Sequence, residues 1–287
     1  MHNNELIKSA NSLKSEEKNF FRYAMAVEYN GSCYAGSQKQ PRQRTVQSEL
    51  ESALSVLIKQ EVKTIFSGRT DAGVHAQGQI VHFDLAFQLD TCKLMHSLNA
   101  ILPSDISVNS IVEVDCNFHS QKSAKARWYR YTINNRPQRS VWQKEALNIQ
   151  QKLNVDEMNK ALSFLIGSHD FSSFKSANST NSATECTVIY TQCKSEADII
   201  HIDIIANRFL YNMVRIVIGT LISIGKGTFP AEYMLEVLNA KDRTKAGPTA
   251  RPEGLTLMSV YYGKKYNISD YLIMEAIYNE NLLCKAS

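Results

Sequence analysis

Two charged residues of opposite sign, Arg69 and Asp71, lie two positions apart in a segment that also contains glycines at positions 68, 73 and 78. Carboxylates serve enzymes as nucleophiles and general bases, and a guanidinium binds phosphate or carboxylate groups. Glycines allow positive φ angles and let a backbone approach a ligand closely. We therefore expect a reactive loop in which the Asp71 carboxylate is the nucleophile or general base.

The sequence on either side of this loop predicts two strands that hold it in place. Residues 62–66 alternate apolar and polar side chains, and residues 80–83 are β-branched or aromatic. Both patterns are typical of strands. A loop between two strands is a common support for a catalytic side chain.

Hydrophobic periodicity predicts the remaining elements. The expected strands are 20–29, 106–114, 126–133, 187–193, 199–205 and 257–262, and the expected helices are 45–59 (with Thr45 as N-cap), 90–102, 155–165, 210–223, 231–238 and 271–283. A polar run over residues 175–184 predicts a loop. Strands that interleave with helices favour an α+β sheet with helices on one face.

Composition bounds the class of protein. The chain has 287 residues, of which 44% are hydrophobic and 21% charged, with a net charge of +4. Its six cysteines form no C-x-x-C pair, which argues against a zinc site or a disulfide framework. Residues 1–19 lack the apolar core of a secretory signal, and no apolar run reaches membrane-spanning length. We expect a cytoplasmic globular protein with no membrane partner.

Positive charge is concentrated between residues 121 and 144, where seven cations occur without a single Asp or Glu. The cations are Lys122, Lys125, Arg127, Arg130, Arg136, Arg139 and Lys144, and the aromatic residues Trp128, Tyr129, Tyr131 and Trp142 lie among them. Such a strip suits phosphates and unstacked bases. A solvated edge strand that resists aggregation is an equally good interpretation.

A metal-assisted hydrolase is a further alternative. His75 and His82, with Asp71 and Asp84, offer four groups that can bind a metal ion. Their spacing matches no metal signature, so we expect surface or RNA-contacting histidines instead.

Several segments together resemble the tRNA pseudouridine synthase A family. The matching motifs lie at residues 29–40, 45–54, 67–84, 98–106, 127–131, 167–171, 207–215 and 246–250, in the family's order. The resemblance runs from about residue 22 to about residue 263 and implies an enzyme that isomerises uridine to pseudouridine in tRNA.

The resemblance also implies roles for single residues. Asp71 is similar to the family's catalytic aspartate, and Arg215 to the arginine that pairs with it. Tyr129 resembles the tyrosine of the uracil pocket, and Arg69 the arginine that contacts phosphate or fills the space of an extruded base. The isomerisation involves no redox change or external group, so we expect no cofactor and no metal.

The family's fold implies two similar domains that form a long, mostly antiparallel mixed sheet around a central basic catalytic cleft. We expect an extension (1–19), a catalytic domain (20–145), a second domain that completes the cleft (146–265) and a tail (266–287). The resemblance further implies a homodimer that acts on positions 38, 39 and 40 of the tRNA anticodon arm. A non-catalytic RNA-binding protein on the same scaffold is the alternative.

Three positions depart from the family pattern. Ser37 stands where the family usually has Trp, and Gln121 and Lys122 replace an Arg and an aromatic residue. These departures affect expected packing and tRNA docking, and none involves Asp71, Tyr129 or Arg215.

Overall fold

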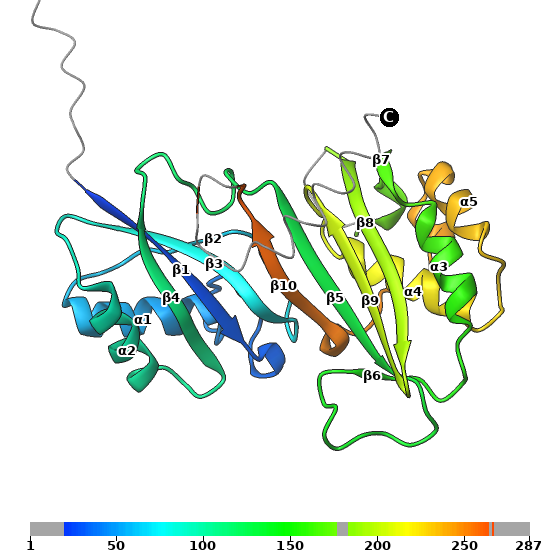
Figure 1. Cartoon of the computed structure of the whole chain (residues 1–287), viewed down its shortest axis with the longest axis horizontal. Coiled ribbons are helices and arrows are strands. Elements are labelled where there is room, and N and C mark those ends of the chain that lie inside the picture. The colour runs from blue at the N-terminus through cyan, green and yellow to red at the C-terminus, as the bar shows by residue number, and fades with distance from the viewer. Residues whose placement is uncertain (1–19, 177–182, 264–265, 267–287) are drawn as a thin grey trace, which may run out of the picture.

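The computed structural model describes residues 20–176, 183–263 and 266. In this part of the chain ten strands form one mixed sheet in the order β4-β1-β3-β10-β5-β9-β8-β7, with β2 beside β3 and β6 beside β5 (Figure 1). Neighbours are antiparallel except for β10 with β3 and β5 with β6. The predicted α+β fold, a long and mostly antiparallel mixed sheet with helices on one face, is confirmed.

The strands are β1 (Phe21–Tyr29), β2 (Ile65–Phe66), β3 (His75–Leu85), β4 (Ile106–Val114), β5 (Ala126–Asn134), β6 (Leu147–Asn148), β7 (Gly167–Asp170), β8 (Glu185–Glu196), β9 (Ile199–Ala206) and β10 (Leu255–Tyr261). The helices are α1 (Val46–Ile58), α2 (Thr91–Ile101), α3 (Val155–Ser163), α4 (Met213–Gly225) and α5 (Tyr233–Ala240). The extension 1–19, the tail beyond residue 266 with the predicted helix 271–283, and part of the predicted loop 175–184 lie outside the described residues.

Local sequence explains where α1 begins and which face it buries. Thr45 accepts a hydrogen bond from the backbone N–H of Ser48, whose side chain bonds back to Thr45, so the N-terminal turn is capped. Val46, Leu50 and Leu54 repeat at helical spacing and are fully buried. The helix therefore forms from its own signals and packs its apolar face inward, as the sequence predicts.

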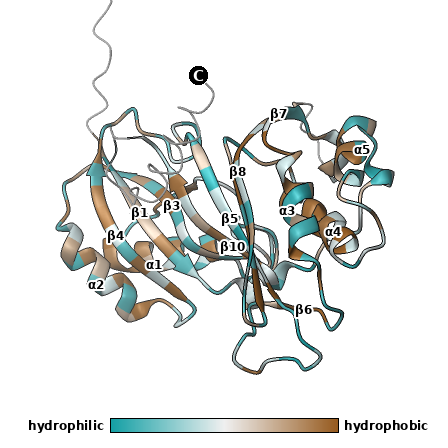
Figure 2. Ribbon diagram, turned by 45° about the vertical axis from the view of Figure 1, so that its right-hand side comes forward, coloured by the Kyte–Doolittle hydropathy of each residue, from teal (hydrophilic) through white to brown (hydrophobic). Residues whose placement is uncertain are grey.

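Two clusters of buried side chains form the core. One contains α1, α2 and the strands β1, β3 and β4, and the other contains α3, α4, α5 and the strands β8 and β9. Along β9, Ile200, Ile202 and Ile204 enter the second cluster, whereas His201 and Asp203 between them face the opposite side of the sheet. Figure 2 shows the largely hydrophobic ribbon of α4 beside the mixed ribbon of α3. The helices thus cover one face of the sheet.

Strands β5 and β10 lie at the centre of the sheet and join the two clusters. Leu255 belongs to one cluster and Leu257 to the other, and Tyr129 packs against both. The central position of β5 overturns the edge-strand interpretation of the basic strip, because β5 pairs with β10 on one side and β9 on the other.

Short strands escaped the sequence pattern. Strand β6 has two residues and β7 has the sequence Gly-Ser-His-Asp, which carries little strand propensity. Both form because a longer strand offers them hydrogen-bonding partners. Within the described residues no helix combines the length and apolar character needed to cross a membrane.

The buried imidazole of His82 predicts how stability depends on pH. Burial, with the nearby charges of Arg22 and His119, lowers the pKa of His82 to about 4. The backbone N–H of Ser120 donates to its Nδ1 over 3.2 Å, which requires that nitrogen to be unprotonated. Unfolded chains protonate histidine near pH 6.5, so this contribution is full above pH 6.5 and is lost as the pH falls toward 4.

We expect the free energy of unfolding to fall by about 2 kcal/mol from this group between pH 7.5 and pH 5. Urea unfolding at both values, for wild type and His82→Asn, measures it, because the variant lacks the titrating ring. His96→Asn, on the exposed surface of α2, is the matched control. An equal pH dependence for wild type and His82→Asn would contradict the assignment.

Candidate active site

Asp71 lies in the loop between β2 and β3, where its carboxylate meets the guanidinium of Arg215 from α4. Nη1 of Arg215 lies 3.1 Å from Oδ2 of Asp71. The side chain of Arg215 is 16% exposed and that of Asp71 is 22% exposed. The structure therefore brings together two residues that are 144 positions apart in sequence, and leaves the carboxylate accessible to a ligand.

The guanidinium of Arg215 is held by neighbours besides Asp71. Its Nε donates to the carbonyl oxygen of Ala250 over 2.8 Å, and its Nη1 donates to Oδ1 of Asn212 over 3.0 Å. Asn212 precedes α4 with φ of 61°, a left-handed conformation that asparagine tolerates better than most residues. Because α4 is otherwise apolar and mostly buried, this cation needs such partners.

Backbone and hydroxyl contacts fix the residue before Asp71. The N–H of Thr70 donates to Oγ of Ser37 over 2.9 Å, and its carbonyl accepts from the N–H of Ser37 over 3.0 Å. The Thr70 hydroxyl also bonds the buried hydroxyl of Tyr29 over 2.8 Å. Gly36 has φ of 107°, and a Cβ there would lie 2.8 Å from the Thr70 carbonyl oxygen. The loop thus packs on this segment at backbone distance.

The rest of the loop is tied to β3. The Gln79 side chain bonds Oγ of Ser67 and the carbonyl of Gly68. Of the three glycines noted in the sequence, only Gly73 uses a positive φ, of 78°. Gly78 instead lies against the backbone of β10, and Gly68 has open space around it. Asp71 is therefore presented by a loop that is anchored on both sides.

Tyr129 lies on the central strand β5 with its ring edge-on to Phe209, at 5.2 Å between ring centroids. Burial raises the pKa of the Tyr129 phenol well above its usual range, and the charges of Tyr29 and Asp71 raise it further. Its hydroxyl is consequently neutral at physiological pH. The effect of Asp71 on this pKa shows that the phenol lies within electrostatic range of the carboxylate.

Arg69 differs from the other three predicted site residues. Its side chain is exposed, and within the described residues it forms no ion pair. The structure does not hold Arg69 against Asp71; it leaves the cation free to meet a ligand outside the loop.

Two arginines of the basic strip serve the protein itself. The guanidinium of Arg127 donates to the backbone carbonyls of Ala124, Asn207, Ser67 and Gln121, at 2.7 to 3.3 Å. Burial lowers the pKa of Arg127. Arg130 forms two hydrogen bonds with Asp203, at 2.9 and 3.0 Å. The phosphate-binding interpretation can therefore apply only to the exposed members of the strip.

The four groups of the metal-assisted alternative are not brought together. His75 accepts from the N–H of Gly31 over 3.1 Å, and His82 bonds Ser120. Asp84 pairs with Arg22 at 2.6 Å, whereas Asp71 pairs with Arg215. The described residues contain no group of three or more His, Cys, Asp or Glu side chains placed to hold a metal ion.

Comparison with known proteins identifies the family. The family model "tRNA pseudouridine synthase" matches residues 25–121 and 161–263. A tRNA pseudouridine synthase A of Thermoanaerobacter sp. (strain X514) is 42% identical over 239 residues, which are 83% of this chain and 98% of the relative. The corresponding protein of Klebsiella pneumoniae (strain 342) is 38% identical over 254 residues, 88% of this chain and 94% of the relative.

The chain belongs to the tRNA pseudouridine synthase family. The resemblance seen in the sequence motifs is thereby confirmed, and the protein is an isomerase of the tRNA pseudouridine synthase A type. Among solved structures, a crystal structure of a Cbf5-Nop10-Gar1 complex aligns with a TM-score of 0.32. The aligned part is 9% identical and covers 69% of this chain and 54% of that one.

The departures from the usual synthase pattern have visible consequences. Ser37 is fully buried and supplies the hydroxyl that accepts from Thr70, so it replaces expected aromatic packing with a hydrogen bond. Gln121 and Lys122 both have exposed side chains. Gln121 contributes its backbone carbonyl, which Arg127 binds over 2.8 Å.

Sequence reasoning missed residues that act through others in this synthase. Asn212 orients Arg215, and Phe209 packs on Tyr129. An asparagine directly before a helix ordinarily indicates an extended N-cap, so the sequence does not signal the left-handed conformation of Asn212. No sequence signal marks the carbonyl of Ala250 as an acceptor, because every residue carries one.

The Ser37 hydroxyl offers a test of the loop anchor. Ser37→Ala leaves the buried N–H of Thr70 without its acceptor, so we expect a loss of about 1–3 kcal/mol in the free energy of unfolding. Turnover should fall as well, because Asp71 follows Thr70 directly. Urea unfolding and an activity assay measure both, with the exposed Ser195→Ala as control. Wild-type stability and turnover in Ser37→Ala would refute the anchor.

Proposed function

We propose that this isomerase converts uridine to pseudouridine at positions 38, 39 and 40 of the tRNA anticodon arm, with Asp71 as the catalytic nucleophile. The observation that carries the proposal is the ion pair of Asp71 and Arg215, with Tyr129 on β5 near enough for the charge of Asp71 to raise the pKa of its phenol. It supplies one accessible carboxylate, one fixed cation and one aromatic ring within a single site. The resemblance of the sequence motifs supports the choice of positions.

The reaction defines what the site must do. The N1–C1′ bond of uridine breaks, a C5–C1′ bond forms, the proton on C5 leaves and N1 gains a proton. The net change is an isomerisation, so neither an oxidant nor a group donor is consumed. The site has to stabilise the sugar and the detached uracil, and keep the uracil in place while it turns.

We assign the first task to Asp71. A nucleophilic carboxylate has to be ionised, and an adjacent guanidinium favours the ionised form. The contacts of Arg215 with Asn212 and Ala250 hold that guanidinium in position before substrate binds. Attack at C1′ of the sugar and attack at C6 of the uracil both use the same carboxylate, and elimination to a glycal uses it as a base.

We assign the uracil pocket to Tyr129. A nucleotide must leave its stack for the reaction, and an aromatic ring can stack on the extruded base. Because the pKa of Tyr129 is raised, its hydroxyl meets the uracil as a neutral group that both donates and accepts a hydrogen bond. A phenolate base at neutral pH is disfavoured by the same burial.

Arg69 and the larger assembly complete the proposal. Arg69, exposed and without an ion pair in the described residues, is available to contact phosphate or to fill the space of the extruded base. Three adjacent target positions require recognition of the shape of the tRNA anticodon stem-loop rather than of its bases. We propose a cytoplasmic homodimer, with residues 20–145 and 146–265 as the two units around the site. The two core clusters support the existence of two units, and β5 and β10 connect them.

Tritium release from tRNA labelled at uracil C5 tests the role of Asp71. Wild type should release tritium with EDTA present, and Asp71→Asn should reduce the rate by at least about 10³-fold, because an amide is not a nucleophile. Asp156→Asn, which removes an exposed carboxylate from the first turn of α3, is the control.

Each outcome separates the interpretations. Equal release by wild type and Asp71→Asn would refute the nucleophile. No release by folded wild type that still binds tRNA would favour the non-catalytic RNA-binding alternative. Release abolished by EDTA would point to metal-assisted chemistry.

The raised pKa of Tyr129 predicts a pH profile. Tyr129→Phe should lower kcat, because the uracil loses a hydrogen-bonding partner. The ratio of wild-type to Tyr129→Phe kcat should stay constant from pH 6 to pH 9.5, since the wild-type phenol does not ionise there. Tyr233→Phe, on α5, is the control. A ratio that changes with an apparent pKa below 9.5 would show that a phenolate takes part.

A further inference from the structure

Residues 135–146 form a loop between β5 and β6 that extends beyond the end of the sheet (Figure 1). We call this loop the arm. It presents Trp142, which is 90% exposed, and Val141, which is 63% exposed. A tryptophan so exposed on a water-facing loop is unusual, because its ring buries a large apolar area wherever a partner exists. The arm is therefore a candidate binding surface.

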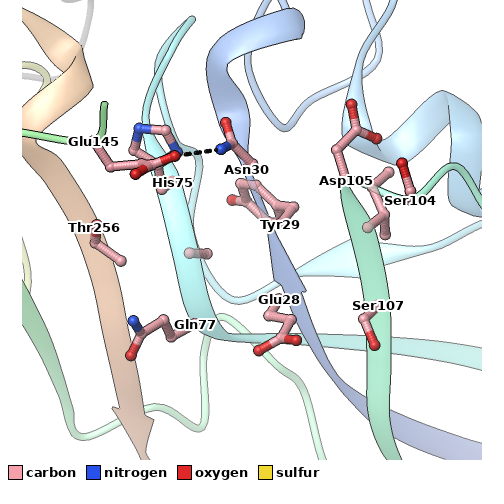
Figure 3. Close-up of a pocket in the computed structure, with 12 residues that line it drawn as sticks. Glu28, Tyr29, Asn30, His75, Gln77, Ser104, Asp105, Ser107, Glu145 and Thr256 are labelled. Atoms are coloured by element: carbon pink, nitrogen blue, oxygen red, sulfur yellow. Dashed lines mark hydrogen bonds between the residues drawn. The ribbon is translucent and has the colours of Figure 1, made fainter. Parts of the chain in front are cut away.

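The arm is anchored at both ends. Asn134 donates to Oδ1 of Asn148 over 2.6 Å, and Asn135 donates to the carbonyl of Ile149 over 2.9 Å. At the returning end, Nδ2 of Asn30 donates to Oε1 of Glu145 over 2.9 Å (Figure 3). These bonds hold the base of the arm against both β5 and the end of β1. A ligand that the arm binds is thus positioned relative to the sheet.

The arm forms one wall of a cavity of about 580 Å³ that is rich in cations. Arg139 and Lys144 line it from the arm, and Arg251 and one carboxylate, Glu253, line it from the opposite side. Arg251 pairs with Glu253 at 2.7 Å. Arg139 and Lys144 form no ion pair within the described residues, so their charge is available to an anion.

This cavity adjoins the active site. Gly73, two residues after Asp71, lines it, and the ring of Pro252 packs against Gly73. Arg251 directly follows Ala250, the residue whose carbonyl holds Arg215. A phosphate bound here therefore lies beside the loop that carries Asp71.

Charges of opposite sign line the two cavities on either side of the base of the arm. Lys144 lines the cationic cavity, whereas its neighbour Glu145 lines a second cavity of about 380 Å³ (Figure 3). Glu28 and Asp105 also line this second cavity. A polyanion is repelled by the second cavity and attracted by the first, which fixes the side on which it passes the arm.

We propose that the arm binds unpaired nucleotides of the substrate RNA next to the target uridine: Arg139 and Lys144 hold backbone phosphate in the cationic cavity, and Trp142 stacks on a base. The inference rests on the proposed function and deepens it. Single-stranded RNA is bound by cations that follow the backbone and by aromatic rings that take the bases. A protein partner fits less well, because lysine is depleted at protein interfaces, whereas cations beside an exposed aromatic ring are the usual elements of a surface for single-stranded RNA.

The cations are tested by Arg139→Gln with Lys144→Gln, using an unmodified tRNA transcript. We expect KM to rise at least tenfold while kcat at saturation stays within twofold of wild type. In filter binding with an Asp71→Asn background, the slope of log K against log salt should fall by about 1.4 to 1.8, the loss of two phosphate contacts. The control is Lys160→Gln with Lys194→Gln, which removes two positive charges from exposed ion pairs on α3 and β8. It should change neither the KM nor the salt slope.

The ring is tested by its own fluorescence, since the chain has two tryptophans and the other, Trp128, bonds Asp203 on the sheet. Adding the transcript should quench wild type, and Trp142→Phe should lose that quenching while it keeps most of the affinity. Trp142→Ala should weaken binding about tenfold, the loss of one stacked base.

The outcomes separate this inference from the proposed function. Wild type without pseudouridine formation would overturn both. Normal turnover by wild type, with unchanged KM, salt slope and quenching in the arm variants, would overturn the arm alone. A Trp142→Ala variant that changes the oligomeric state in sedimentation and leaves RNA binding intact would assign the arm to a protein partner instead.

Discussion

The ion pair of Arg215 and Asp71 is the interaction on which the site depends. It connects a loop supported by the first core cluster to a helix buried in the second, so it fixes the two halves at one point. Its guanidinium also satisfies Asn212 and Ala250, which offsets the cost of removing the charge from water. Because the Arg215 guanidinium bonds three partners on three segments, it is held in one position. The Asp71 carboxylate that pairs with it is thereby held as well.

A fixed carboxylate also needs a rigid loop, and neutral groups provide it. Thr70 is held by its N–H, its carbonyl and its hydroxyl through Ser37 and Tyr29. Gln79 holds the entry of the same loop. None of these groups adds a charge that would compete with Asp71 for Arg215. The loop is therefore rigid without disturbing the electrostatics of the pair.

The sequence predicted what depends on local signals. The capped, amphipathic α1 and the strands β1 and β4 followed from period and capping, and the Asp71 loop from its glycines and flanking strands. Contacts between distant segments did not follow. Nothing in the pattern around Arg127 indicates that it binds four carbonyls, and β6 and β7 depend on neighbours supplied elsewhere. The partnership of Arg215 with Asp71 came from the family resemblance.

The basic strip shows why charge in a sequence does not by itself locate a binding surface. Arg127 and Arg130 lie on a central strand, where desolvation requires them to find acceptors inside the protein. Arg139 and Lys144, nine and fourteen residues after Arg130, lie where water already solvates them, so no internal acceptor is needed. The same run of cations thus divides between β5 and the segments outside it. Strand residues stabilise the frame around Asp71, and exposed cations outside the strand, such as Arg139 and Lys144, keep their charge for a ligand.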